Sequence, residues 1–345
     1  MYPCIDIKVD GILHNISLLK NKCNENKIEF CLVTKMLVGY KKLVEYIIDN
    51  ADIRIICDSR IKNFSAFTDL NVEKWLIRSP MISEVEDVIS YSDVSFNTEL
   101  DVIEKLNVEA KKQNKIHRII LVYESGDLRD GCYINELSDI ISECLMMENI
   151  QIYGIATNLS CVNDTLPNKD NMADFDDTVK KLETHFNRKF KIVSGGASSS
   201  IDMLYKNELP ESINNLRMGE GVYLGNIPVL DVPFKNAITD NFILKAEIIE
   251  LKSKPSVPGV KLDETRLIRK RAIVALGKQD VYLPGLKCVD DNCSVVGGSS
   301  DHIVVDVSDS ETQYKVGDII EFKMTYNCVL NAMNSKFVYK KSFLK

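Results

Sequence analysis

A regular alternation of short apolar runs with amphipathic stretches is the feature that most restricts what this chain can fold into. Eight runs have the composition of buried strands, at Glu29–Thr34, Ile53–Cys57, Trp75–Ile77, Val94–Phe96, Ile119–Tyr123, Ile150–Ile155, Phe190–Val193 and Asn215–Arg217. Most are separated by stretches with helical spacing, of which 40–50, 99–112 and 134–147 are the clearest. Eight strands that alternate with helices predict an α/β fold of the (β/α)8 TIM barrel type. A doubly wound sheet is the alternative.

The pattern changes near residue 230. Short strand-like runs follow at 241–252, 271–276, 303–307, 319–324 and 337–339, with clusters of Pro, Gly and Asp between them. They predict a C-terminal β domain over 231–345, to which the alternating strand at 1–9 is added, and a barrel over 10–230. Asp10 is the expected N-cap of a helix through residue 24. The stretch 252–271 is expected to be a loop, and whether it closes over a site is left open.

The composition of the chain limits the kinds of molecule that it is expected to bind. The chain has 345 residues, 45% of them hydrophobic and 27% charged, and a net charge of −7 with no basic stripe. This composition favours a globular protein that binds neither nucleic acid nor a membrane, since no apolar run approaches the ~20 residues of a membrane span. The ten cysteines contain no CxxC pair, which predicts free thiols in a reducing cytoplasm and no zinc site. The first residues also lack the pattern of a signal peptide.

Lys35 ends the first predicted barrel strand. Burying its charge costs several kcal/mol unless the charge is neutralised or paired. One interpretation is a side chain that extends to solvent at the strand end. The other is a desolvated lysine whose amine is nucleophilic and forms a Schiff base.

Two glycine-rich stretches follow the seventh and eighth predicted strands, at Ser194–Ser200 and at Arg217–Gly221. Barrels commonly hold phosphate at these two loops. A lysine after strand one and a phosphate site after strands seven and eight predict one cofactor that carries both an aldehyde and a phosphate, pyridoxal phosphate (PLP). Arg217 is placed to face the pyridine nitrogen and keep it unprotonated, which favours simple proton removal and return.

The loop Gly126–Gly131 follows the fifth predicted strand and carries Arg129. A guanidinium there can bind a substrate carboxylate with two hydrogen bonds. The alternative is a surface ion pair with Asp127 or Asp130.

Nearly the whole chain resembles the fold-type III PLP enzymes of the alanine racemase superfamily, and most closely their alanine/ornithine racemase branch, nearest to the ornithine racemases. The resemblance rests on the motifs IDI at 5–7 with HN at 14–15, VTK at 33–35, GDLRDG at 126–131, GIATNL at 154–159, SGGASSS at 194–200, LRMGEG at 216–221, IRKRAIVALGKQD at 268–280 and GSSDH at 298–302. It implies a PLP-dependent isomerase with two acid/base groups on opposite faces of the cofactor, and a homodimer with shared active sites.

The resemblance also implies roles for individual residues. The residues that it implies bind the cofactor are Lys35, Asn158, Ser194, Gly196, Ser198, Arg217, Gly219 and Gly221. Lys35 is one catalytic group; the other comes from the partner's β domain. Where alanine racemases have a tyrosine this chain has Lys278, and His302 beside Asp301 is the second choice.

Two further positions depart from alanine racemases. Asn158 stands where those enzymes have an aromatic or imidazole group stacked on the cofactor. Val122 stands where they have a carbamylated lysine that orients the arginine.

The implied activity is two-base proton transfer at Cα that interconverts L- and D-ornithine, with Arg129 on the carboxylate. Asp280, Asp301 and Glu220 are candidate acceptors for a distal ammonium group. Alanine, lysine and arginine stay open as substrates. The rival functions are a non-catalytic PLP carrier, a PLP-dependent lyase or decarboxylase, and a phospho-sugar barrel enzyme.

Overall fold

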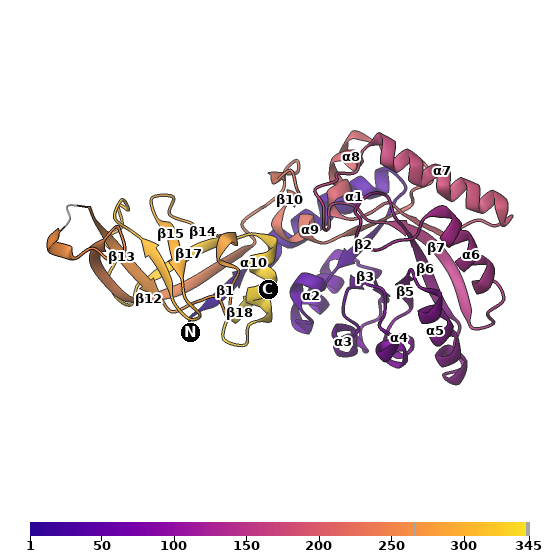
Figure 1. The fold of residues 1–345 in the computed structure, drawn as a ribbon, viewed down its shortest axis with the longest axis horizontal. Coiled ribbons are helices and arrows are strands. Elements are labelled where there is room, and N and C mark those ends of the chain that lie inside the picture. The colour runs from indigo at the N-terminus through magenta and orange to yellow at the C-terminus, as the bar shows by residue number, and fades with distance from the viewer. Residues whose placement is uncertain (265–266, 343–345) are drawn as a thin grey trace. The chain divides into compact units, whose positions relative to one another are not determined.

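The computed structural model describes residues 1–264 and 267–342 (Figure 1). Its contacts separate two compact units, one of Leu13–Ile238 and one of Met1–Ile12 with Thr239–Lys345. The sequence placed the corresponding boundaries at 9/10 and 230/231. In the structure the chain passes from the smaller unit to the larger one inside the first helix, and it returns to the smaller unit just before a long strand of the C-terminal sheet.

Eight parallel strands close into a barrel in the larger unit. They are β2 (Glu29–Val33), β3 (Ile55–Asp58), β4 (Glu73–Leu76), β5 (Val94–Asn97), β6 (His117–Tyr123), β7 (Ile150–Thr157), β8 (Ile192–Ser194) and β9 (Asn215–Met218). Pairing of Glu29 with Asn215 joins the first strand to the last. The predicted barrel is confirmed, and closure excludes the doubly wound sheet.

Helices precede, connect and follow the barrel strands. They are α1 (Val9–Glu25), α2 (Lys41–Ala51), α3 (Ile61–Phe64), α4 (Val85–Tyr91), α5 (Leu100–Lys112), α6 (Ile134–Cys144), α7 (Lys169–His185), α8 (Ile201–Lys206) and α9 (Glu220–Leu224). The prediction that Asp10 caps α1 was wrong, because Asp10 lies inside its first turn. A carboxylate there still interacts favourably with the helix dipole.

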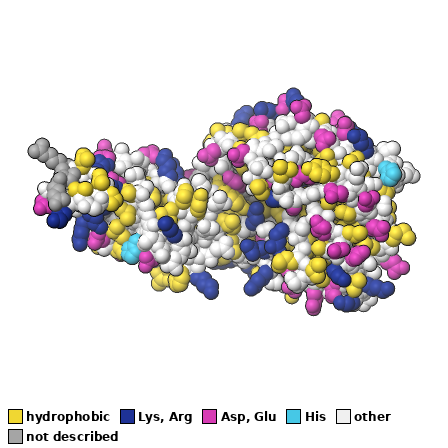
Figure 2. Space-filling model, viewed as in Figure 1, with side chains coloured by type: hydrophobic (Ala, Val, Ile, Leu, Met, Phe, Trp, Pro, Cys, Tyr) yellow, Lys and Arg dark blue, Asp and Glu magenta, His cyan; other side chains and the backbone are white. Residues whose placement is uncertain are grey.

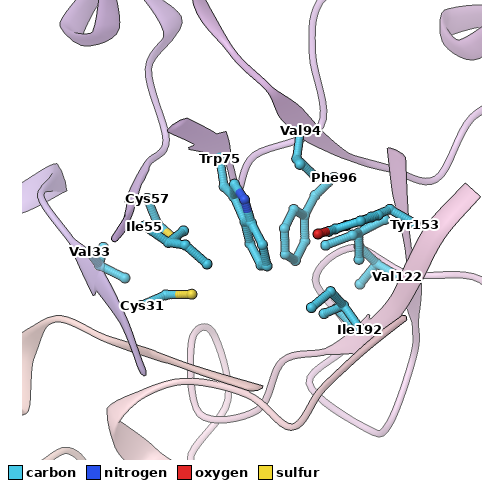
Figure 3. Close-up of a cluster of buried hydrophobic side chains, with 12 residues drawn as sticks. Cys31, Val33, Ile55, Cys57, Trp75, Val94, Phe96, Val122, Tyr153 and Ile192 are labelled. Atoms are coloured by element: carbon cyan, nitrogen blue, oxygen red, sulfur yellow. The ribbon is translucent and has the colours of Figure 1, made fainter. Parts of the chain in front are cut away.

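Alternate strand residues point into the barrel and fill it (Figure 3). The Trp75 ring packs against Phe96 and against the edge of Tyr153, each at 6.3 Å between ring centroids. At the last strand the interior becomes polar, with Asn215 and Arg217 both fully buried. The guanidinium carbon of Arg217 lies 5.0 Å from the Phe96 ring centroid. An apolar core thus meets a buried cation at one part of the barrel wall.

The smaller unit is built on an antiparallel sheet in the order β14-β17-β12-β13-β16-β15, with β1 pairing β12 and β18. Its elements are β1 (Cys4–Ile7), β12 (Phe242–Pro255), β13 (Ile268–Val274), β14 (Leu286–Cys288), β15 (Ser294–Gly298), β16 (Ile303–Asp306), β17 (Ile319–Met324), α10 (Tyr326–Asn334) and β18 (Tyr339–Ser342). A two-stranded ribbon, β10 (Asn226–Ile227) with β11 (Val232–Pro233), belongs to the barrel unit.

The predicted loop at 252–271 is too long at both ends. β12 and β13 stay paired as far as Pro255 and Ile268, because a continuous antiparallel ladder satisfies their backbone groups. The connection is therefore 256–267, of which residues 265–266 lie outside the described part of the chain.

Acidic and basic side chains are interspersed on the face of the molecule drawn in Figure 2. Within residues 1–264 and 267–342, the helices are all too short or too polar to cross a membrane.

Candidate active site

Lys35 lies at the carboxyl end of β2, as the first residue of the 3-10 turn η1 (Lys35–Leu37). The residue before it anchors this end of the strand. The Thr34 amide donates to the Cys57 carbonyl at 2.7 Å, and its hydroxyl donates to the Asp58 carboxylate at 3.0 Å. Asp58 is buried, and burial raises the pKa of its carboxyl group. The lysine is thus held at the barrel mouth by the neighbouring strand.

Glu220 is the acidic neighbour of Lys35. Burial raises the pKa of the Glu220 carboxyl group, and the positive charge of Lys35 acts in the opposite direction. The Asn226 amide donates to the same carboxylate at 3.4 Å. A half-buried lysine and a half-buried carboxylate therefore share this part of the mouth.

Two glycine amides converge on one hydroxyl in the loops that follow β8 and β9. The amides of Gly219 and Gly221 donate to Ser198 Oγ at 3.1 Å and 3.0 Å. A Cβ at Gly221 would lie 2.4 Å from Ile201 Cδ1, so a side chain here would force the end of the Ile201 side chain to move. Gly196 has a φ of +106°, which a residue other than glycine rarely adopts. The loops after β8 and β9 therefore meet in a group of donors that suits an anion.

Arg217 is buried below these loops. It donates to the Thr157 carbonyl at 2.8 Å, to Asn158 Oδ1 and to Ser194 Oγ. Ser194 in turn donates to Asn215 Oδ1 at 2.5 Å. Ser194 is thus directed at the guanidinium and at Asn215.

Burial lowers the pKa of the Arg217 guanidinium, and the positive charge of Arg129 lowers it further. Arg129 also forms an ion pair with Asp130, which is one of the two alternatives that the sequence left open.

The remaining predicted residues lie together in the β domain. The Lys278 amide donates to the Ser299 carbonyl at 2.9 Å, and the Ser299 amide donates to the His302 carbonyl at 2.8 Å. His302 Nδ1 is 2.8 Å from Asp301 Oδ1, and both side chains are exposed, as is Lys278. The two candidates for the second acid/base group thus share one edge of the domain.

Asp280 differs from its neighbours. It is buried and accepts a hydrogen bond from the Ser335 hydroxyl at 2.6 Å. Its carboxylate already has a partner within its own domain.

Residues 7–227 match the family model for the alanine racemase N-terminal domain. The chain belongs to this family. It is 41% identical to the ornithine racemase of Acetoanaerobium sticklandii over 99% of both chains. It is 36% identical to the lysine racemase of Thermotoga maritima, over 99% of this chain and 98% of that one.

Solved structures agree on the fold of this family member. The alanine racemase from Bartonella henselae with covalently bound pyridoxal phosphate superposes with a TM-score of 0.76 at 17% identity, covering 99% of this chain and 100% of that one. At that identity the likeness establishes the shared fold: a barrel with a C-terminal β domain.

Two residues of the barrel site escaped the sequence reasoning. Asp58 holds Thr34, and Asn215 holds Ser194. Asn215 carried a signal, because it lies two residues before Arg217 on one strand and so faces the same side. Asp58 carried one as well, because it is an acidic residue that directly follows the predicted strand 53–57.

Proposed function

We propose that this protein is a PLP-dependent racemase that interconverts L- and D-ornithine. The observation that carries the proposal is the meeting of Lys35, Arg217 and the glycine amides at one end of a barrel of this family. The choice of ornithine is supported by the 41% identity to an ornithine racemase over the full chain.

The barrel mouth fits this cofactor. The amides of Gly219 and Gly221 are donors that a phosphate group can take over when the Ser198 hydroxyl turns aside. Lys35 is the residue that bonds the aldehyde, and Arg217 and Asn158 are assigned to the ring. Ser194 and Gly196 act one step removed, Ser194 by holding Arg217 and Gly196 by shaping the loop after β8.

The bound cofactor supplies an electron sink that acidifies the Cα–H bond of the substrate. The protein moves the proton. The Lys35 amine exchanges it on one face of the substrate. On the opposite face the acid/base group is the partner's Lys278 or the partner's His302, and Asp301 can orient an imidazole through its Nδ1 contact. Arg129 holds the substrate carboxylate.

The distal ammonium group of ornithine needs an acceptor. Among the three predicted carboxylates, Asp280 already receives the Ser335 hydroxyl, whereas Glu220 lies at the barrel mouth and Asp301 is exposed. Glu220 and Asp301 are therefore the favoured acceptors.

The active form is proposed to be a homodimer in which the β domain, 231–345 with 1–9, completes the partner's active site. Apolar side chains on loops that follow the barrel strands support a covered mouth: Met81, Leu128, Val162 and Val229 are all exposed in the single chain. The ten free cysteines support a reducing cytoplasm as the location.

Deuterium uptake at Cα tests this function. The purified protein with PLP is incubated in heavy water with separate L- and D-forms of ornithine, lysine, arginine and alanine, followed by chiral analysis. Exchange with inversion of ornithine is expected. Bound PLP with no exchange in any substrate would favour the carrier function, and exchange with loss of the carboxylate would favour a decarboxylase.

A further inference from the structure

The loop that carries Arg129 is closed at its base. It leaves β6 at Glu124 and returns beside the same strand, where the Cys132 amide donates to the Val122 carbonyl at 2.9 Å and the Glu124 amide donates to the Cys132 carbonyl at 3.1 Å. A Cβ at Gly131 would lie 2.8 Å from the Glu124 amide nitrogen, so the closure is tight. Residues 124–131 therefore form a compact loop with little freedom at its ends.

Asp127 ties this loop to the loop that follows β7. Its Oδ1 accepts the amides of Cys161, Val162 and Asn163 at 3.0, 3.3 and 3.3 Å. The Asn163 side-chain amide donates back to the Asp127 carbonyl at 2.6 Å. Asp127 is almost wholly buried, and its Oδ2 receives no hydrogen bond from the described residues. A buried carboxylate thus fixes the backbone on the amino-terminal side of Arg129.

Asp130 contacts the guanidinium itself. It accepts a hydrogen bond from Arg129 Nε, and the two side chains are 26% and 33% exposed. Across the described residues, nothing accepts a hydrogen bond from the two terminal nitrogens of Arg129. Those two nitrogens form one edge of the planar guanidinium, which can meet a carboxylate with two parallel hydrogen bonds.

We infer that Asp127 and Asp130 are positioning residues for Arg129. Asp130 occupies Nε and leaves the terminal edge to the substrate, and Asp127 holds the loop from which Arg129 projects. The inference rests on the proposed function, since it assigns a substrate carboxylate to Arg129.

Asp130→Asn tests the inference. The KM for ornithine is expected to rise about five- to tenfold, the loss typical of one charge-assisted hydrogen bond that orients a group. Affinity for 1,4-diaminobutane, which is ornithine without its carboxylate, is expected to stay unchanged when measured by calorimetry on the PLP-loaded protein. Asp130→Glu restores much of the KM, and Asp177→Asn, on the outer surface of α7, serves as the charge-matched control.

A double-mutant cycle separates positioning from general damage. Asp130→Asn in an Arg129→Lys background is expected to add little to the KM, because the group that Asp130 orients has gone. An unchanged or lower KM in Asp130→Asn alone would overturn the inference, since Asp130 would then only compete with the substrate. An equal loss of 1,4-diaminobutane affinity would overturn it as well. Failure of the proposed function is distinguishable, because the wild-type protein itself would then not racemise ornithine.

Discussion

Burial of His117 predicts a specific acid sensitivity of the barrel unit. His117 begins β6, is almost wholly buried, and contacts Ser95 Oγ through Nε2 at 2.8 Å. Burial lowers its pKa to about 3, and the charges of Arg118 and Lys115 lower it further. The imidazole is therefore neutral in the folded protein, while in the unfolded chain it takes up a proton near its ordinary pKa of about 6.5.

The sign and size of this effect on the free energy of unfolding follow from the linkage between proton binding and folding. Because the pKa is lower in the folded state, the unfolded state binds the extra proton, and stability falls as the pH falls below about 6.5. Above that pH His117 has no such effect. Each pH unit between about 6.5 and about 3 removes about 1.4 kcal/mol, so His117 alone lowers the free energy of unfolding by about 2 kcal/mol between pH 7.5 and pH 5.

Urea unfolding of the His117→Gln variant measures this contribution. Trp75 is the single tryptophan of the chain and lies inside the barrel, so its fluorescence reports the unit that contains His117. The variant is expected to lose about 2 kcal/mol less than the wild-type protein between pH 7.5 and pH 5, whatever its stability at pH 7.5. His185→Gln, at the exposed end of α7, is the control and should follow the wild type. Parallel pH dependence of the His117 variant and the wild type would refute the reasoning.

Three further predictions concern the site. Lys35→Ala should keep the fold but lower racemisation by at least about a thousandfold, measured as Cα deuterium exchange, because the amine that bonds the cofactor is missing; residual activity near wild type would contradict the proposed function. Arg217→Met should lower the free energy of unfolding by about 3 kcal/mol, since Thr157, Asn158 and Ser194 lose a donor inside the barrel; thermal unfolding measures it, and an unchanged melting temperature would be inconsistent with this network. Gly221→Ala should weaken PLP binding and lower the free energy of unfolding by about 1 kcal/mol, because its Cβ would force the Cδ1 end of the Ile201 side chain to move; titration of the apo protein with PLP checks the first effect and calorimetry the second.

Periodicity within the sequence was enough to locate the barrel strands. Each of the eight predicted runs overlaps one of the strands β2 to β9, with ends that differ by up to two residues, and the Lys35 segment lies at the end of the first of them. Such patterns are local: a buried parallel strand is a short apolar run, and the loop that follows it is adjacent in sequence. The carboxyl ends of parallel strands meet at one end of a barrel, so candidate residues on different loops could be assigned to one site.

The strands and helix of the C-terminal domain were predicted less completely from the sequence than those of the barrel. The sequence missed β14, β15 and α10, and it placed a loop where β12 and β13 remain paired. β14 and β15 are short, and β14 pairs with β17, which lies more than thirty residues further along the chain. In β12 and β13, which are the central strands of the sheet, pairing with neighbouring strands outweighs the weak local preference of the sequence.

The sequence by itself determined which residues reach the barrel mouth, because strand order and strand ends follow from local apolar periodicity. Only the tertiary structure decided what those residues contact. In the folded chain the glycine amides donate to the Ser198 hydroxyl, and Ser194 bonds to Arg217 and Asn215. The Asp127 carboxylate accepts hydrogen bonds from three amides of the next loop. Each of these contacts joins side chains or amides from different βα units. Their directions depend on how the closed sheet orients each strand, and that orientation is set by the whole barrel rather than by neighbours in the chain.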